Sequence, residues 1–168
     1  MKRIILCVTA LICLMLFVSC SSESGTEKKL DATDYSVQET LNRCLESSLF
    51  PGPPIVYQNG SDKELDADYL DYYFGSSSLL EDVTGYVFIT SPTTDVNEAG
   101  VFKVTTESGR KALIKAFETR RDTLVQTHTN YSATDLQISE NMTIGYFDDV
   151  VYFIATPDNS VVESLIKR

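Results

Sequence analysis

Five acidic side chains alternate with other residues in one short segment that could hold a cation. They are Asp62, Glu64, Asp66, Asp68 and Asp71. Alternating carboxylates are typical of calcium-binding loops, because calcium prefers oxygen ligands. However, Ala67 stands where such a loop needs glycine, and Tyr73 stands where it needs a bidentate acid. We therefore expect an exposed helical face here and assign no metal ligand.

One acid and two arginines are predicted to meet inside the domain. Glu98 shares strand parity with Phe102 and Val104, on the more apolar side of a predicted strand. Arg121 falls within the apolar arc of the next predicted helix, and Arg120 lies near the margin of that arc. Because an unpaired buried charge is costly, we predict a Glu98–Arg121 ion pair, with Arg120 as the substitute. Its simplest role is an internal brace, and a ligand site is the alternative.

A second group of basic residues is predicted on the outer side of the same helix. It consists of Arg110, Lys111 and Lys115. A solvated helix face is the simpler interpretation, and contact with lipid head groups or an acidic wall polymer is the alternative.

Enzyme motifs are largely missing from the sequence. The chain has one histidine, His128, near a predicted helix end. No nucleophile elbow, phosphate-binding loop or dinucleotide fingerprint occurs, so we assign no catalytic residue and no cofactor. The 24 acidic residues leave a glycosidase-like carboxylate pair open. Some of the nine tyrosines could line a sugar or peptide groove, although tyrosines more often fill cores.

The N-terminus has the layout of a secretory signal peptide. Basic Lys2 and Arg3 precede the uncharged, largely apolar run Ile4–Val18. As a helix this run would span about 22 Å, which is shorter than the hydrocarbon core of about 30 Å. The length favours a cleaved leader over a permanent membrane span.

The end of the leader resembles the lipobox of bacterial lipoproteins, on the residues Phe17-Val18-Ser19-Cys20 and the polar run that follows. The resemblance implies lipidation of the Cys20 thiol and removal of residues 1–19. Phe17 departs from the usual leucine, and an ordinary signal with a coincidental cysteine is the alternative. Residues 20–33 are predicted to be a flexible tether. We expect an extracytoplasmic protein that is held at the membrane by lipid on Cys20.

Composition limits the partners and the domain count. The chain carries 14 basic and 24 acidic residues, with a formal charge of −10. This balance argues against nucleic-acid binding, which needs clustered basic residues. After loss of the leader and lipidation, only Cys44 would keep a thiol, and it lies on a predicted apolar stripe where burial makes it inert. Residues 34–168 are long enough for one globular domain.

The elements that position these residues follow from periodicity. One helix is predicted from Val37 to about Leu49, and a second from Ser61 to Gly75. Beyond Gly85 the pattern predicts two strands, a long helix, a short helix or turn, two strands and a final helix. The ranges are 86–90, 98–105, 108–128, 132–135, 142–147, 150–156 and the residues after Asn159.

The predicted fold is α+β, with a four-stranded antiparallel sheet built in strand-strand-helix, strand-strand-helix order. The strands are apolar on both faces, so both faces need cover. We expect the two later helices on one face and the N-terminal helices on the other face or at the sheet edge. If those helices dock elsewhere, a partner protein would have to supply the cover.

The chain from about Leu79 to its end is similar to the bacterial lipoprotein family labelled domain of unknown function 4358. The matching features are Glu98–Val104, Arg120-Arg121, Tyr131 and the hairpin from Tyr146 to Ile154. The resemblance implies a Gram-positive source and anchoring on the outer leaflet of the plasma membrane. It implies no activity, since the family has none established.

These observations together predict a non-catalytic binding or interaction module at the cell envelope. Its expected partners are the membrane, through Cys20, and an envelope protein or wall polymer that the sequence does not identify. The alternative is a small wall-active hydrolase that uses paired carboxylates.

Overall fold

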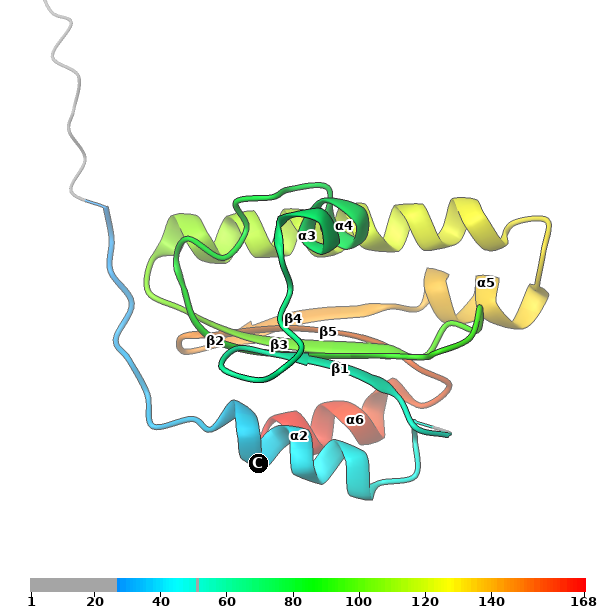
Figure 1. The fold of residues 1–168 in the computed structure, drawn as a ribbon, viewed down its shortest axis with the longest axis horizontal. Helices are drawn as coiled ribbons and strands as arrows, with labels where there is room; N and C mark the ends of the chain where they lie inside the picture. The colour runs from blue at the N-terminus through cyan, green and yellow to red at the C-terminus, as the bar shows by residue number, and fades with distance from the viewer. Residues whose placement is uncertain (1–26, 51) are drawn as a thin grey trace, which may run out of the picture.

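The computed structural model describes residues 27–50 and 52–168, and it shows a sheet between two layers of helices (Figure 1). On one face lie α3 (Ala67–Phe74), α4 (Glu107–His128) and α5 (Ala133–Glu140). On the other face lie α2 (Val37–Glu46) and α6 (Asn159–Ile166). None of the helices in these residues has the length and apolarity needed to cross a bilayer. The predicted leader 1–19 and Cys20 lie outside the described residues.

The sheet has five strands, and all neighbouring strands are antiparallel in the order β1-β2-β3-β5-β4. The strands are β1 (Ile55–Gln58), β2 (Val83–Thr90), β3 (Glu98–Val104), β4 (Thr143–Phe147) and β5 (Val150–Ala155). The α+β class and the antiparallel pairing are confirmed, but the predicted four-stranded sheet is wrong. Strand β1 was missed because four residues after a proline-rich turn carry too little periodicity to indicate a strand. Helix α5 also interrupts the predicted repeat of strand-strand-helix units.

Both faces of the sheet are buried under helices, as the two-sided apolar pattern requires. On one face Phe102 and Phe153 pack against Phe117 of α4, with ring centroids 5.3 Å and 4.7 Å from it. On the other face Ile154 lies in a separate cluster with Leu41 of α2 and residues of α6. The buried apolar side chains on both faces supply the main stabilisation of the fold.

Each face is covered by helices from both parts of the chain: α3 with α4 and α5 on one face, and α2 with α6 on the other. The predicted grouping of the helices is therefore wrong. Strands β3 and β4 are both antiparallel to β5 and therefore run parallel to each other. A crossover between parallel strands has a preferred hand, which ties α4 to one face. Helix α6 packs on the other face, where it contacts α2 and β5.

The helix boundaries follow from local capping. Ser36 accepts a hydrogen bond from Glu39 N (3.2 Å), as the capping pattern predicts. The second helix begins at Ala67 and not at Ser61, because the Ser61 hydroxyl donates to Gln58 O within a turn (2.8 Å). Asp66 takes the capping role in its place by accepting from the backbone of α3.

Residues 28–33 form an ordered strap along the domain and not the flexible tether that the sequence predicts. Leu30 N donates to Thr105 O (2.9 Å), and Glu107 N donates to Lys28 O (3.0 Å). Figure 1 shows this blue segment passing the end of the sheet near the start of α4. Both hydrogen bonds join the strap to residues more than 70 positions away in the sequence, and composition alone does not reveal such pairings. Residues 28–33, which the sequence assigns to the tether, are therefore part of the domain.

The strap ends on a buried carboxylate in the β4–β5 turn. Thr33 N donates to Asp149 Oδ2 (3.1 Å), and Lys103 Nζ lies 3.6 Å from the same oxygen. Lys103 Nζ also donates to Thr33 O (2.7 Å). Burial alone would raise the pKa of Asp149, but the Thr33 hydrogen bonds and the Lys103 charge outweigh it and hold the pKa below its usual value.

We expect Asp149→Asn to lower the free energy of unfolding by about 1.5–3 kcal/mol at pH 7, the range for hydrogen bonds to a charged group. The pKa of Asp149 is lower in the folded than in the unfolded chain. Its contribution is therefore present above the unfolded pKa of about 4 and is lost as the pH falls further. Urea titrations of both proteins at pH 7 and at lower pH values would measure this.

The matched control is Asp148→Asn, at the exposed neighbouring position. It should change the free energy of unfolding by less than about 0.5 kcal/mol. A difference between wild type and Asp149→Asn that stays constant from pH 7 to acid would contradict the assigned role of the Asp149 charge.

Candidate ligand groove

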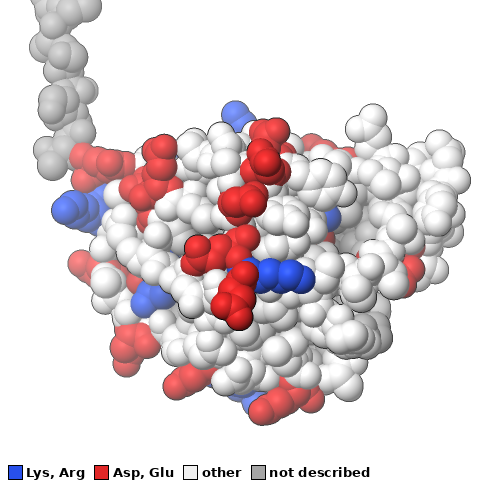
Figure 2. Space-filling view, in the orientation of Figure 1, with Lys and Arg blue, Asp and Glu red and all other residues white. Residues whose placement is uncertain are grey.

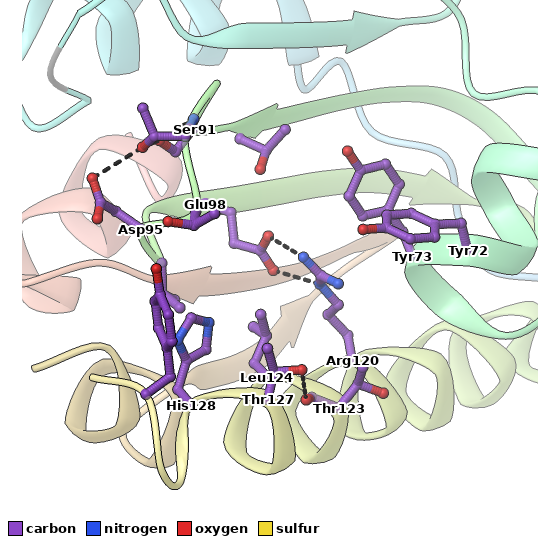
Figure 3. Close-up of a pocket in the computed structure, with 15 residues that line it drawn as sticks. Tyr72, Tyr73, Ser91, Asp95, Glu98, Arg120, Thr123, Leu124, Thr127 and His128 are labelled. Atoms are coloured by element: carbon purple, nitrogen blue, oxygen red, sulfur yellow. Dashed lines mark hydrogen bonds and ion pairs between the residues drawn. The ribbon is translucent and has the colours of Figure 1, made fainter. Parts of the chain in front are cut away.

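A groove of about 610 Å³ opens between the C-terminal half of α4, the end of α3 and the β2–β3 connection. Three tyrosines, six serine or threonine residues and four ionisable side chains line it, together with Val96 and Leu124. Figure 3 shows Tyr72 and Tyr73 at one end, His128 at the other, and the Glu98 and Arg120 side chains between them. The volume falls in the range of small-molecule sites.

A buried bidentate ion pair lies in the middle of the groove (Figure 3). Arg120 Nε donates to Glu98 Oε1 (2.9 Å), and Arg120 Nη2 donates to Glu98 Oε2 (2.8 Å). Glu98 is 2% exposed, and the Arg120 guanidinium lies 5.0 Å from the centre of the Tyr73 ring. Burial alone would lower the pKa of Arg120, but the Glu98 carboxylate outweighs it and the pKa is raised. Arg120 is therefore held charged, and its two hydrogen bonds to Glu98 fix the geometry of the pair.

The partner of Glu98 is Arg120, and the preferred prediction of Arg121 is wrong. Arg121 Nε lies 3.5 Å from Asp122 Oδ1, and the side chain is 36% exposed. It lines a different hollow beside β4. The helical wheel placed both arginines near one apolar arc. The position of α4 across the sheet decides which of the two arginines reaches Glu98 at the start of β3. A helical wheel does not contain that position.

His128 and Asp135 form a second polar pair at the α5 end of the groove. His128 is 4% exposed, and its Nδ1 lies 4.0 Å from Asp135 Oδ2. The other oxygen of Asp135 accepts a hydrogen bond from Val96 N (2.9 Å), which fastens the β2–β3 connection to α5. Within the described part of the chain, His128 Nδ1 has no hydrogen-bond partner.

Sequence reasoning placed His128 at a helix end but missed Asp135. The pattern around Ser132 and Asp135 predicts a helix start, and Ser132 does accept a hydrogen bond from Asp135 N (3.2 Å). A carboxylate in a first helical turn is usually explained by the helix dipole alone. Only the fold of α5 back against α4 gives Asp135 its second role.

Two further features of the described residues bear on reactivity, possible metal ligands and the Cys44 thiol. Residues 27–50 and 52–168 contain no group of three or more His, Cys, Asp or Glu that could hold a metal ion. Burial raises the pKa of the Cys44 thiol to about 11, and Arg43 lowers it only in part. Cys44 is 2% exposed and packs in the cluster on the opposite face of the sheet. The thiol is therefore protonated and inaccessible at neutral pH.

The two surface charge clusters of the sequence are also placed by the structure. The acidic residues of the segment 62–71 are exposed. On the side of the molecule that Figure 2 shows, acidic side chains outnumber basic ones. Asp66 is engaged as a helix cap. In the basic cluster, Arg110 contacts Glu107 (3.1 Å) and stacks over the Tyr146 ring (4.7 Å), whereas Lys111 and Lys115 are exposed. The charge of Arg110 is thus already compensated.

The family model described as Domain of unknown function (DUF4358) matches residues 56–156, which is more than half of the chain. The chain belongs to this family. Comparison with curated proteins and with solved structures gives no significant match. The DUF4358 match contains β2 to β5, nearly all of β1 and every residue of the groove. The strap, α2 and α6 lie outside it.

We expect Arg120→Ala to lower the free energy of unfolding by about 3–5 kcal/mol, because it leaves the buried Glu98 carboxylate without a partner. Urea denaturation followed by circular dichroism would measure the loss. The double variant Glu98→Leu/Arg120→Met should recover most of it, since both charges are then removed together.

Arg121→Ala is the control for loss of an arginine from the same helix. With one contact at 3.5 Å and a partly exposed side chain, it should cost less than about 1 kcal/mol. Equal losses for Arg120→Ala and Arg121→Ala would contradict the assignment of the buried pair.

Proposed function

We propose that this DUF4358 protein is a lipid-anchored, non-catalytic binding module on the extracytoplasmic side of the cell membrane. Its ligand would occupy the groove between α4 and the β2–β3 connection. The observation that carries the proposal is the groove itself, which combines exposed tyrosines and hydroxyls with an ion pair whose carboxylate is already engaged. Such a site can orient a ligand without transforming it.

The placement of the strap supports an outward-facing groove. The strap contacts the domain at Glu107, the first residue of α4, whereas His128 is the last residue of that helix. At 1.5 Å per residue, the two ends of α4 are about 32 Å apart. If residues 1–27 lead to the membrane, the groove lies at the distal end of the domain, where it would meet the cell wall or a neighbouring envelope protein.

The hydrolase alternative finds less support in the groove. Asp95 and Glu98 are its only two carboxylate-bearing residues among those described. Both oxygens of Glu98 accept from Arg120, and Asp95 accepts from the Thr93 hydroxyl (2.9 Å). A glycosidase pair needs two carboxyl groups that can both reach the substrate, and here both oxygens of Glu98 are occupied by Arg120.

The anchoring proposal is tested by Cys20→Ser in the full chain. The wild-type protein should appear in the membrane fraction, with mass spectrometry showing a diacylglyceryl-modified Cys20 as the mature N-terminus. The variant should lose the lipid and leave the membrane fraction. An unmodified Cys20 in the wild-type protein, or unchanged membrane association of the variant, would overturn the anchor.

The binding proposal is tested by filling the groove. Chemical crosslinking on intact cells should join the wild-type protein to its partner. Thr127 lines the groove on α4, so Thr127→Trp should place an indole in it and abolish these crosslinked products. The matched control is Gln126→Trp, at the next residue of α4, which is exposed and outside the groove. It should retain those products.

Circular dichroism would confirm that both tryptophan variants are folded. Retention of the same crosslinked products by Thr127→Trp, or equal loss in both variants, would count against the groove as the binding site.

A further inference from the structure

We propose that the groove binds a neutral oligosaccharide, an inference that rests on the proposed binding function and names its ligand class. Three separate features of the groove lead to this class: two exposed aromatic side chains, a set of hydrogen-bonding groups without protein partners, and a charge balance that disfavours anions.

Two exposed tyrosines mark the ends of the groove. Tyr72 on α3 is 74% exposed, and Tyr131 in the α4–α5 turn is 72% exposed. The Tyr72 ring is 4.9 Å from the ring of Tyr73, which lies beneath the Arg120 guanidinium, and the Tyr131 ring is 6.1 Å from that of His128. From Arg120 to His128 the groove follows α4 for roughly 12 Å. An exposed aromatic face suits the apolar C–H face of a sugar ring, whose hydroxyls point sideways.

Between these tyrosines lie donors that the protein itself leaves unused. Arg120 donates from Nε and Nη2 to Glu98, and its Nη1 makes no hydrogen bond to any described residue. His128 Nδ1 lies 4.0 Å from Asp135 Oδ2 and has no hydrogen-bond partner among residues 27–50 and 52–168. Arg120 Nη1 can donate to a ligand hydroxyl, and the nitrogens of a histidine ring can donate to or accept from one.

The threonines of α4 provide the complementary acceptors. Thr123 donates to Thr119 O (2.9 Å), and Thr127 donates to Thr123 O (2.8 Å), so each hydroxyl keeps lone pairs that can accept. Both residues face the groove. A ligand rich in hydroxyls uses donors and acceptors together, whereas an aliphatic ligand would leave both unsatisfied.

The charges of the groove favour a neutral ligand over an anionic one. Among the described residues that line the groove, two bear carboxylates, Asp95 and Glu98, and one is an arginine, whose charge is compensated by Glu98. Asp135 adds a carboxylate beside His128. The chain as a whole is also acidic, at −10. A peptide is the rival ligand, but peptide sites rely on an open strand edge or deep apolar pockets, and the middle of this groove is an ion pair.

The direct test is isothermal titration of the full chain, purified from membranes in a detergent without a sugar head group. The probes are cellotetraose and tetra-N-acetylchitotetraose, two neutral tetrasaccharides, with a lysine-rich peptide and polyglutamate for comparison. At least one tetrasaccharide should bind, and polyglutamate should not.

Tyr72→Ala and Tyr131→Ala should each weaken tetrasaccharide binding by about tenfold, the usual effect of removing an aromatic anchor. Tyr146→Ala is the matched control, because Tyr146 is 57% exposed and lies on β4 outside the groove. It should bind as the wild-type protein does. All three positions are exposed, so the variants should fold.

The outcomes separate this inference from the proposed function. Failure of both tetrasaccharides to bind, or binding that neither Tyr72→Ala nor Tyr131→Ala weakens, overturns the oligosaccharide proposal. If Thr127→Trp still abolishes crosslinking in that case, the binding module stands with another ligand class. Binding of the lysine-rich peptide alone would assign that class to cationic peptides.

Discussion

The groove depends on the bidentate pair between Glu98 and Arg120. This pair connects the first residue of β3 to the middle of α4, and Tyr73 of α3 lies over the guanidinium, so one interaction fixes three elements. Two charges removed from water are tolerated only when each meets the other in good geometry. The shape of the groove is therefore held by an interaction that occupies both carboxylate oxygens of Glu98.

The rest of the fold follows from a sheet that is apolar on both faces. Helices α3 and α4 bury one face, and α2 and α6 bury the other. Hydrogen bonds also join α2 and the segment before it to α6: Arg43 Nε donates to Leu165 O (3.0 Å), and Tyr35 OH donates to Ile166 O (2.9 Å). Within residues 27–50 and 52–168, both faces of the sheet are thus covered by helices of the chain itself.

The two ends of the domain have different roles in this arrangement. The strap, Asp149 and Lys103 lie together near the start of α4, whereas the groove lies near its end. The family match contains the groove but not the strap, α2 or α6. The part shared with the family thus carries the candidate site, and the segments outside the match complete the second layer and hold the chain that leads to the predicted anchor.

Local patterns in the sequence determined the long helix, the central strands, the two-sided apolar sheet and the burial of Cys44, because each depends on periodicity within a few residues. They also limited the predicted ion-pair partner of Glu98 to Arg120 and Arg121. The tertiary structure decided that Arg120 is the partner, that Asp135 meets His128, that β1 joins the sheet and that residues 28–33 form a strap. Each of these depends on contacts between segments distant in the chain, and such contacts are set by how helices lie across the sheet and not by the spacing of residues along it.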